Sequence, residues 1–319
     1  MARAKPIANL NCRNAAAKVI RQVLQARMRE MCAFRHQALR WEDPEGVHDM
    51  RVASRRLRCA LSDFKPYLRK GSMPSSRLKA IAKSLGAVRD EDVAIAALEE
   101  LRSKADENIG KGIEAIAEEH RRQRGQARSV LEETIKASAI AELRQDFHTR
   151  LETATKLPED PAAEEGANQV PTFSQLGASI ICDRLKQLAE YGDSVYRPLR
   201  TKQLHRMRIL AKRLRYAVDL FAPCWGDELK TSAAEIAHLQ TSLGELHDCD
   251  VWIGKLGRRL KKDTSDASAA LDPRQNKDAV VWLLDYFVRE RTKHYGDALA
   301  RWHEWEREGF FDHLRAMLK

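Results

Sequence analysis

The sequence contains little that would interrupt a helix. Its 319 residues include only 10 prolines and 15 glycines, and aromatic residues make up 6% of the chain. From Ser75 to Leu157 there is no proline, and the strong helix formers Ala, Leu, Glu, Arg and Lys dominate. Segments rich in β-branched residues and bounded by turns are also missing, so strands have no obvious place. We therefore predict an all-α fold.

Long apolar runs are absent as well. No stretch of about 18 apolar residues occurs, which argues against a membrane-spanning helix. The first 20 residues are interrupted by Pro6, Arg13 and Lys18 and lack the apolar region of a signal peptide. The hydrophobic content of 43% is nevertheless too high for a disordered chain. We expect a folded, cytoplasmic protein.

Cysteine and histidine show no metal-binding or cross-linking pattern. The six cysteines include no C-x-x-C pair, and their spacing fits neither a zinc module nor a disulfide framework. No histidines form an H-E-x-x-H motif. We therefore expect scattered free thiols in a reducing compartment, and neither a metal ion nor a cofactor.

The two halves of the chain repeat each other. Residues 47–64 read VHDMRVASRRLRCALSDF and residues 204–221 read LHRMRILAKRLRYAVDLF, with eight identities at an offset of 157. Further along, LGAVRDEDV (85–93) corresponds to LGELHDCDV (243–251). We predict two helical repeats, 1–157 and 172–319, joined by a proline-rich acidic linker at 158–171. Pro66 and Pro223 are expected to end the repeated helix.

A helical wheel separates each repeated segment into an apolar and a basic face. The predicted apolar faces are Met50, Ala53, Leu57, Ala60, Leu61 and Phe64, and Met207, Leu210, Leu214, Ala217, Val218 and Phe221. The basic faces are His48, Arg51, Arg55 and Arg58, called stripe 1, and His205, Arg208, Lys212 and Arg215, called stripe 2. Residues 48–58 carry a net charge of +3 and residues 205–215 carry +5, so these segments hold most of the chain's +10.

The two stripes favour an anion-binding function. A single basic stripe is usually a solvated helix face, but two copies headed by a histidine are typical of anion recognition. The planar fork of arginine suits phosphate oxygens, and imidazole can donate a hydrogen bond or gain a proton near pH 6.5. Bound phosphate would favour protonated His48 and His205, so we expect anion affinity to fall as pH rises. Arg56 and Arg213 lie off the stripes and are expected to brace neighbouring carboxylates.

The repeated L-G-x-x-x-D-x-D-V motif has two interpretations. Gly86 and Gly244 cost about 1 kcal/mol each within a helix, which predicts close helix–helix approach there, against the basic helix. Asp90 and Asp248 are then expected to orient a stripe arginine from behind. The alternative is a catalytic or metal-binding carboxylate pair in each copy, Asp90 with Asp92 and Asp248 with Asp250.

Both motif pairs, together with the C-terminal segment WHEWEREGFFDHL, resemble the conserved-histidine α-helical domain (CHAD) family over essentially the whole chain. The resemblance implies one domain, residues 1–319, of two pseudo-symmetric helical bundles packed around a basic central groove or pore. It also implies binding of inorganic polyphosphate by both stripes, with Arg89 added. His247 stands where the first repeat has Arg89, which predicts less fixed charge in the second half. Tyr216 is expected to flank the anion site.

We therefore predict a non-enzymatic polyphosphate-binding protein, cytoplasmic and compatible with polyphosphate granules. One alternative is a nucleic-acid-binding helical protein, although base recognition usually brings Asn, Gln or stacking aromatics to the contact face, where only Tyr216 qualifies. A less favoured alternative is a polyphosphate-processing enzyme, for which no nucleophile or metal-ligand spacing is evident. The sequence does not indicate an oligomeric state.

Overall fold

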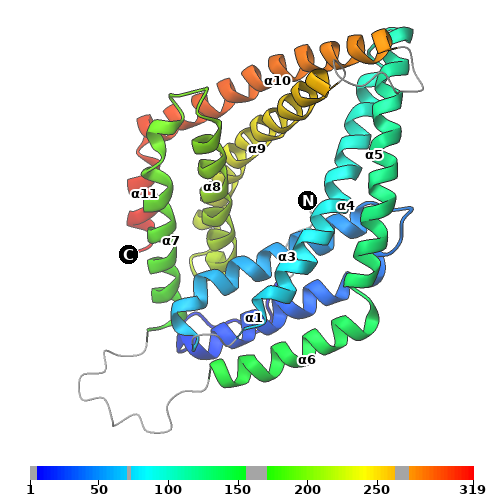
Figure 1. Cartoon of the computed structure of the whole chain (residues 1–319). Helices are drawn as coiled ribbons and strands as arrows, with labels where there is room; N and C mark the ends of the chain where they lie inside the picture. The colour runs from blue at the N-terminus through cyan, green and yellow to red at the C-terminus, as the bar shows by residue number, and fades with distance from the viewer. Residues whose placement is uncertain (1–5, 70–72, 156–170, 263–272) are drawn as a thin grey trace. The chain divides into compact units, whose positions relative to one another are not determined.

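The computed structural model describes residues 6–69, 73–155, 171–262 and 273–319. The predicted all-α fold is confirmed, since these ranges form helices and contain no β-strand (Figure 1). One isolated antiparallel bridge joins Ala15 to Thr172. Of the predicted linker at 158–171, all but Pro171 lies outside the described residues.

The described helices divide into two compact units. Unit 1 lies within residues 1–92 and 123–180, and unit 2 lies within 93–122 and 181–319. The helical hairpin of α4 (Ser75–Arg102) and α5 (Glu107–Thr134) contributes to both units, as does α7 (Phe173–Ala189). The boundaries of the two units therefore differ from those of the predicted sequence repeats. Duplication of the helical repeat stays a prediction from sequence.

In unit 1 the basic helix α3 packs against the two helices that precede it in the chain. Unit 1 also contains α1 (Ala16–Ala33), α2 (Arg35–Ala38) and α6 (Ala137–Ala154). Helix α3 (Glu45–Phe64) contacts α1 and α2, and α1 contacts α6. At Gly46 a Cβ atom would lie 2.1 Å from the carbonyl oxygen of Gln37, so only glycine allows α2 and α3 to approach this closely. The ring of Phe64 packs 6.3 Å from that of Phe173.

In unit 2 the second basic helix, α8 (Thr201–Phe221), packs along α9 (Asp227–Lys262). Helix α9 also packs against α10 (Pro273–Glu308), and the chain continues into α11 (Phe310–Met317). Residues of the α4–α5 hairpin join this core, including Leu98 and Ile113, which cluster with Leu256 and Leu283. These contacts place residues 93–122 in unit 2.

The predicted ends and apolar faces of the repeated helices are confirmed. Helix α3 ends at Phe64 and α8 ends at Phe221, and Pro66 and Pro223 lie in the 3₁₀ turns Lys65–Tyr67 and Ala222–Cys224. The apolar face of α3 is buried except for the partly exposed Leu61. The apolar face of α8 is buried at every predicted position. Each basic helix is therefore anchored by the side opposite its stripe.

The expectation of free cysteines needs correction at two positions. Cys12 and Cys224 each take part in a disulfide, whereas Cys32, Cys59, Cys182 and Cys249 form no disulfide. Sequence spacing could not reveal this, because disulfide formation depends on the geometry of the folded chain.

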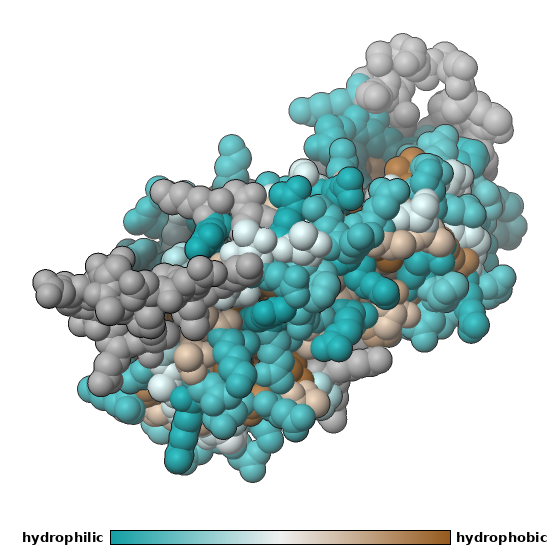
Figure 2. Space-filling model, turned by 90° about the horizontal axis from the view of Figure 1, so that it is seen from below, coloured by the Kyte–Doolittle hydropathy of each residue, from teal (hydrophilic) through white to brown (hydrophobic). Residues whose placement is uncertain are grey.

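Hydrophobic side chains on the surface are scattered. Figure 2 shows hydrophilic residues over most of the face drawn, with hydrophobic residues in small separate areas. Exposed large side chains such as Val130, Leu199 and Val281 come from different segments. No helix among the described residues is long and apolar enough to cross a membrane.

We expect Leu57→Ala or Leu214→Ala to lower the free energy of unfolding by about 2–5 kcal/mol, because each would leave a cavity. Both leucine side chains are 0% exposed. Leu199→Ala is the matched control, since Leu199 is 87% exposed. Urea unfolding of the three variants measures the difference. Equal stabilities would contradict the assignment of the buried helix faces.

Candidate anion-binding site

Stripe 1 lies along α3, facing the L-G-x-x-x-D-x-D-V motif on α4. His48, Arg51 and Arg55 are half-buried, while Arg58 is exposed. The Arg51 side chain donates a hydrogen bond to the Asp90 carboxylate over 3.4 Å. Arg89 of the same motif lies 4.0 Å from the Glu45 carboxylate at the start of α3. Unit 1 thus brings together the stripe and the motif, which are separated in sequence.

Stripe 2 lies along α8 and meets the second copy of the motif on α9. The Nδ1 atoms of His205 and His247 are 3.1 Å apart, and the ring centroids are 4.0 Å apart. One imidazole must donate and the other accept for this contact to be a hydrogen bond. Arg208 lies 4.0 Å from the Asp248 carboxylate. Unit 2 therefore pairs two histidines where unit 1 has His48 and Arg89.

The motif glycines make room for an arginine in both units. A Cβ atom at Gly86 would lie 3.9 Å from Nε of Arg51, and one at Gly244 would lie 3.8 Å from Nε of Arg208. These are ordinary contact distances, so each glycine borders an arginine side chain and is not wedged against a backbone. The sequence predicted a close approach of two helices at these glycines; the structure shows instead that each glycine contacts an arginine side chain of the basic helix. Arg51 and Arg208 thus occupy equivalent positions, each beside a glycine and near an aspartate.

The second aspartate of each motif is held by arginines that the sequence analysis did not identify. Asp92, with a side chain 5% exposed, lies 3.4 Å from Arg124 and 4.0 Å from Arg128 on α5. Asp250 accepts a 2.6 Å hydrogen bond from Nε of Arg291 on α10. Carboxylates engaged in this way support the next helix and are poorly placed for catalysis or for binding a metal.

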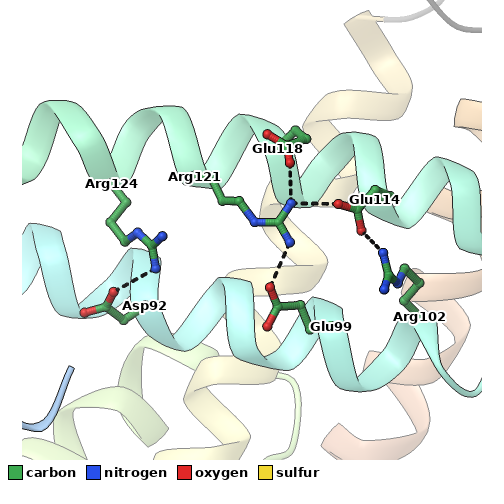
Figure 3. A network of polar contacts seen from close by, with 7 residues as sticks. All are labelled: Asp92, Glu99, Arg102, Glu114, Glu118, Arg121 and Arg124. Carbon is green, nitrogen blue, oxygen red and sulfur yellow. Dashed lines mark hydrogen bonds and ion pairs between the residues drawn. The ribbon is translucent and has the colours of Figure 1, made fainter. Parts of the chain in front are cut away.

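Other arginines of the hairpin are neutralised by carboxylates. Arg121 lies 2.8 Å from Glu99 and 2.7 Å from Glu114, and it also pairs with Glu118 (Figure 3). Arg102 pairs with Glu114 as well. These cations stabilise the hairpin and are unavailable to an added anion.

The off-stripe arginines differ between the repeats. Arg56 lies 3.5 Å from Glu30, a buried carboxylate that also accepts a 2.7 Å hydrogen bond from Arg27. Within the described part of the chain, Arg213 makes no ion pair. The repeated motifs could not predict the partner of Arg56, because Glu30 lies on α1, outside both motifs.

The far end of stripe 2 is less open than the wheel suggests. The Arg215 side chain is 11% exposed and lies 3.9 Å from Asp219. Its guanidinium also stacks over the Tyr216 ring, 5.2 Å from the centroid. Tyr216 itself is only 6% exposed, so it does not offer a free ring face beside the stripe. The expectation that it flanks the anion site is therefore corrected.

Burial and neighbouring cations keep the stripe histidines neutral. Burial lowers the pKa of His48, and Arg89 adds to the effect. Burial and Arg208 lower the pKa of His205. Burial, together with His205, Arg208 and Lys212, lowers the pKa of His247 to about 4. The free protein therefore begins to protonate these histidines below the pH 6.5 expected from sequence.

One group of side chains has a geometry that a metal ion could use. Ligand atoms of Glu45, His48 and Asp49 lie within 4.8 Å of one another. Arg89 lies 4.0 Å from the Glu45 carboxylate and so competes for the charge that a cation would need. Among the described residues no other set of three such side chains meets this geometry.

Comparison with known proteins identifies a family. The sequence profile of the CHAD domain matches residues 22–257. The fold is similar to the crystal structure of the CHAD domain from the plant Ricinus communis, with a TM-score of 0.70, 19% identity, and coverage of 94% of this chain and 96% of that one. It is also similar to PptA from Streptomyces chartreusis, with a TM-score of 0.62, 14% identity, and coverage of 91% and 100%. No curated protein sequence matches the chain.

We expect the His205–His247 pair to make the folded protein less stable as the pH is lowered. In the unfolded chain a histidine takes up its proton near pH 6.5, whereas folded His247 does so only at about pH 4. Between these values the unfolded state binds more protons, so acid favours unfolding. The melting temperature of His205→Gln/His247→Gln should fall less between pH 7 and 4.5 than that of the unsubstituted protein.

The exposed His36 provides the control, since His36→Gln should follow the unsubstituted protein across the same range. Parallel melting curves for all three proteins would show that the paired imidazoles do not titrate in this way.

Proposed function

The chain belongs to the CHAD domain family, and on that premise we propose that it binds inorganic polyphosphate through stripe 1 and stripe 2 without hydrolysing it. The contacts proposed are His48, Arg51, Arg55, Arg58 and Arg89 in unit 1, and His205, Arg208, Lys212 and Arg215 in unit 2. Each unit presents its own stripe, so the proposal can be tested one unit at a time.

The observation that carries the proposal is the repeated placement of Arg51 and Arg208. In both units the arginine runs past a motif glycine, and its guanidinium lies near an aspartate. The Nε atom of Arg208 is buried and has no hydrogen-bond acceptor among the described residues. A buried donor without an acceptor is costly, and a phosphate oxygen is a suitable acceptor for it.

Electrostatic repulsion within each stripe supports the same function. Like charges three or four residues apart weaken a helix by a few tenths of a kcal/mol per pair. A phosphate chain would relieve that repulsion along the whole stripe. Capture of this kind releases counterions, so affinity should fall steeply as salt concentration rises.

The alternatives have less support from the side chains present. Base stacking along the stripes would need exposed aromatic rings beside the cations, and Tyr216, the aromatic residue within the stripe 2 segment, is buried. A hydrolase would need reactive carboxylates, yet Asp92 and Asp250 are engaged by arginines. A passive binding surface fits the stripes better than either alternative.

We expect Arg51→Ala/Arg208→Ala to weaken binding of long-chain polyphosphate by more than tenfold. Hydrogen bonds to charged groups contribute about 1.5–3 kcal/mol each, and 1.4 kcal/mol corresponds to tenfold in affinity. Calorimetric titration at fixed salt measures the loss, and a melting curve checks the fold. Arg77→Ala/Lys277→Ala is the matched control, because it removes one exposed cation from each unit outside the stripes. Equal affinities of the two double variants would contradict the proposed site.

We expect long-chain polyphosphate to prevent binding of labelled duplex DNA at equal concentrations of phosphate groups, because the stripes lack side chains suited to reading bases. Fluorescence anisotropy measures the competition. In a parallel assay with Mg²⁺ or Mn²⁺, no phosphate should be released from polyphosphate. Stronger competition by DNA would favour the nucleic-acid alternative, and steady phosphate release would favour the enzyme.

A further inference from the structure

The residues that lead into the two basic helices carry opposite charges. At the shared offset of 157, three acidic positions in the first repeat correspond to three basic positions in the second. The pairs are Asp43 and Arg200, Glu45 and Lys202, and Asp49 and Arg206. The stripes themselves match closely, so this charge reversal is confined to the start of each helix.

In unit 2 the three cations are exposed and available. Arg200 immediately precedes α8, and its backbone carbonyl accepts hydrogen bonds from the N–H groups of Gln203 and Leu204. The side chains of Arg200, Lys202 and Arg206 are exposed and make no ion pair with any residue in the described ranges. The first turn of α8 contains no acidic residue. We call these three residues the lead cluster.

The backbone beneath the lead cluster is tied to α10. Arg291 donates a 2.6 Å hydrogen bond to the carbonyl oxygen of Pro198 while its Nε binds Asp250. The Tyr295 hydroxyl donates a 2.7 Å hydrogen bond to the carbonyl oxygen of Val195. A fixed backbone presents its cations with less loss of conformational entropy on binding. Arg291 therefore links the lead cluster to the motif that meets stripe 2.

In unit 1 the corresponding positions oppose an anion. The Asp43 carboxylate accepts a hydrogen bond from the N–H of Glu45 over 2.9 Å. The Glu45 side chain is 62% exposed and lies 4.0 Å from Arg89, so it partly neutralises a proposed contact. Asp49 lies with Glu45 and His48 in one carboxylate–imidazole group. A phosphate chain reaching this end of stripe 1 would meet negative charge.

From these features we propose that the polyphosphate surface of unit 2 continues before His205 onto Arg200 and Lys202 and widens around α8 to Arg206, whereas that of unit 1 stops at Glu45 and Asp49. This rests on the proposed function and adds that the two units bind unequally, with unit 2 binding more tightly. At a rise of about 1.5 Å per residue, the stretch of α8 from Lys202 to Arg215 is about 20 Å long, whereas stripe 2 alone, from His205 to Arg215, is about 15 Å long. Longer contact with more phosphates gives unit 2 the higher affinity.

The test exchanges charge between equivalent positions. Lys202→Glu/Arg206→Asp gives unit 2 the residues of unit 1, and Glu45→Lys/Asp49→Arg does the reverse. Asp43 is kept, because its carboxylate binds the Glu45 backbone. Lys186→Glu/Lys277→Glu makes the same change in net charge at exposed positions on α7 and α10. Titrations use long-chain polyphosphate at fixed salt with a chelator, which removes any effect of a metal at Glu45.

We expect Lys202→Glu/Arg206→Asp to weaken binding by about tenfold or more relative to the control, and Glu45→Lys/Asp49→Arg to strengthen it several-fold. The neutral Lys202→Gln/Arg206→Gln should lie between, and it serves if the charge reversal unfolds the protein. If reversal in unit 2 has no more effect than the control while Arg51→Ala/Arg208→Ala still weakens binding by more than tenfold, the lead cluster is overturned and the proposed function stands. An unsubstituted protein that does not bind polyphosphate overturns both.

Discussion

Like-charged side chains crowded along one side of a helix repel one another, and burial of the opposite side is what holds such a helix in place. On α3, Met50, Leu57 and Phe64 are completely buried, and on α8 Met207, Leu214 and Phe221 are equally buried. The transfer of each large apolar side chain from water contributes about 1.5–3 kcal/mol, whereas each repulsive pair costs only tenths. The apolar faces can therefore hold each stripe in place against this repulsion. In the α4–α5 hairpin, three glutamates surround the single cation Arg121.

The two aspartates of each motif have different roles: the first lies near a stripe arginine, and the second binds an arginine of the next helix. Asp90 and Asp248 are exposed and lie near stripe arginines, where they orient a guanidinium that remains within reach of solvent. Asp92 and Asp250 are mostly buried and bind arginines of the following helix. Asp92 and Asp250 thereby help to hold in place the helices, α4 and α9, that carry Asp90 and Asp248. Spacing of two residues on a helix makes this possible, because it points the two side chains about 200° apart.

Local periodicity explains what was predictable from sequence. The helix faces, the ends near Pro66 and Pro223, and the meeting of Arg51 with Asp90 follow from patterns within short segments or from their repetition. Arg124, Arg128 and Arg291 were missed because their pairing depends on packing between helices that share no motif. Tyr216 was misplaced because a wheel gives the direction of a side chain but not how much of the helix its neighbours cover. The assignment of residues 93–122 to unit 2 likewise depends on tertiary contacts with α9 and α10.

The central claim is that polyphosphate lies along stripe 1 and stripe 2, and a crystal structure of the protein soaked with a short polyphosphate tests it most directly. We predict phosphate density beside Arg51 and Arg58 on α3 and beside His205 and Arg208 on α8, with oxygens accepting hydrogen bonds from the guanidinium groups. Density confined to other basic positions, with both stripes bare at saturating ligand, would contradict the account.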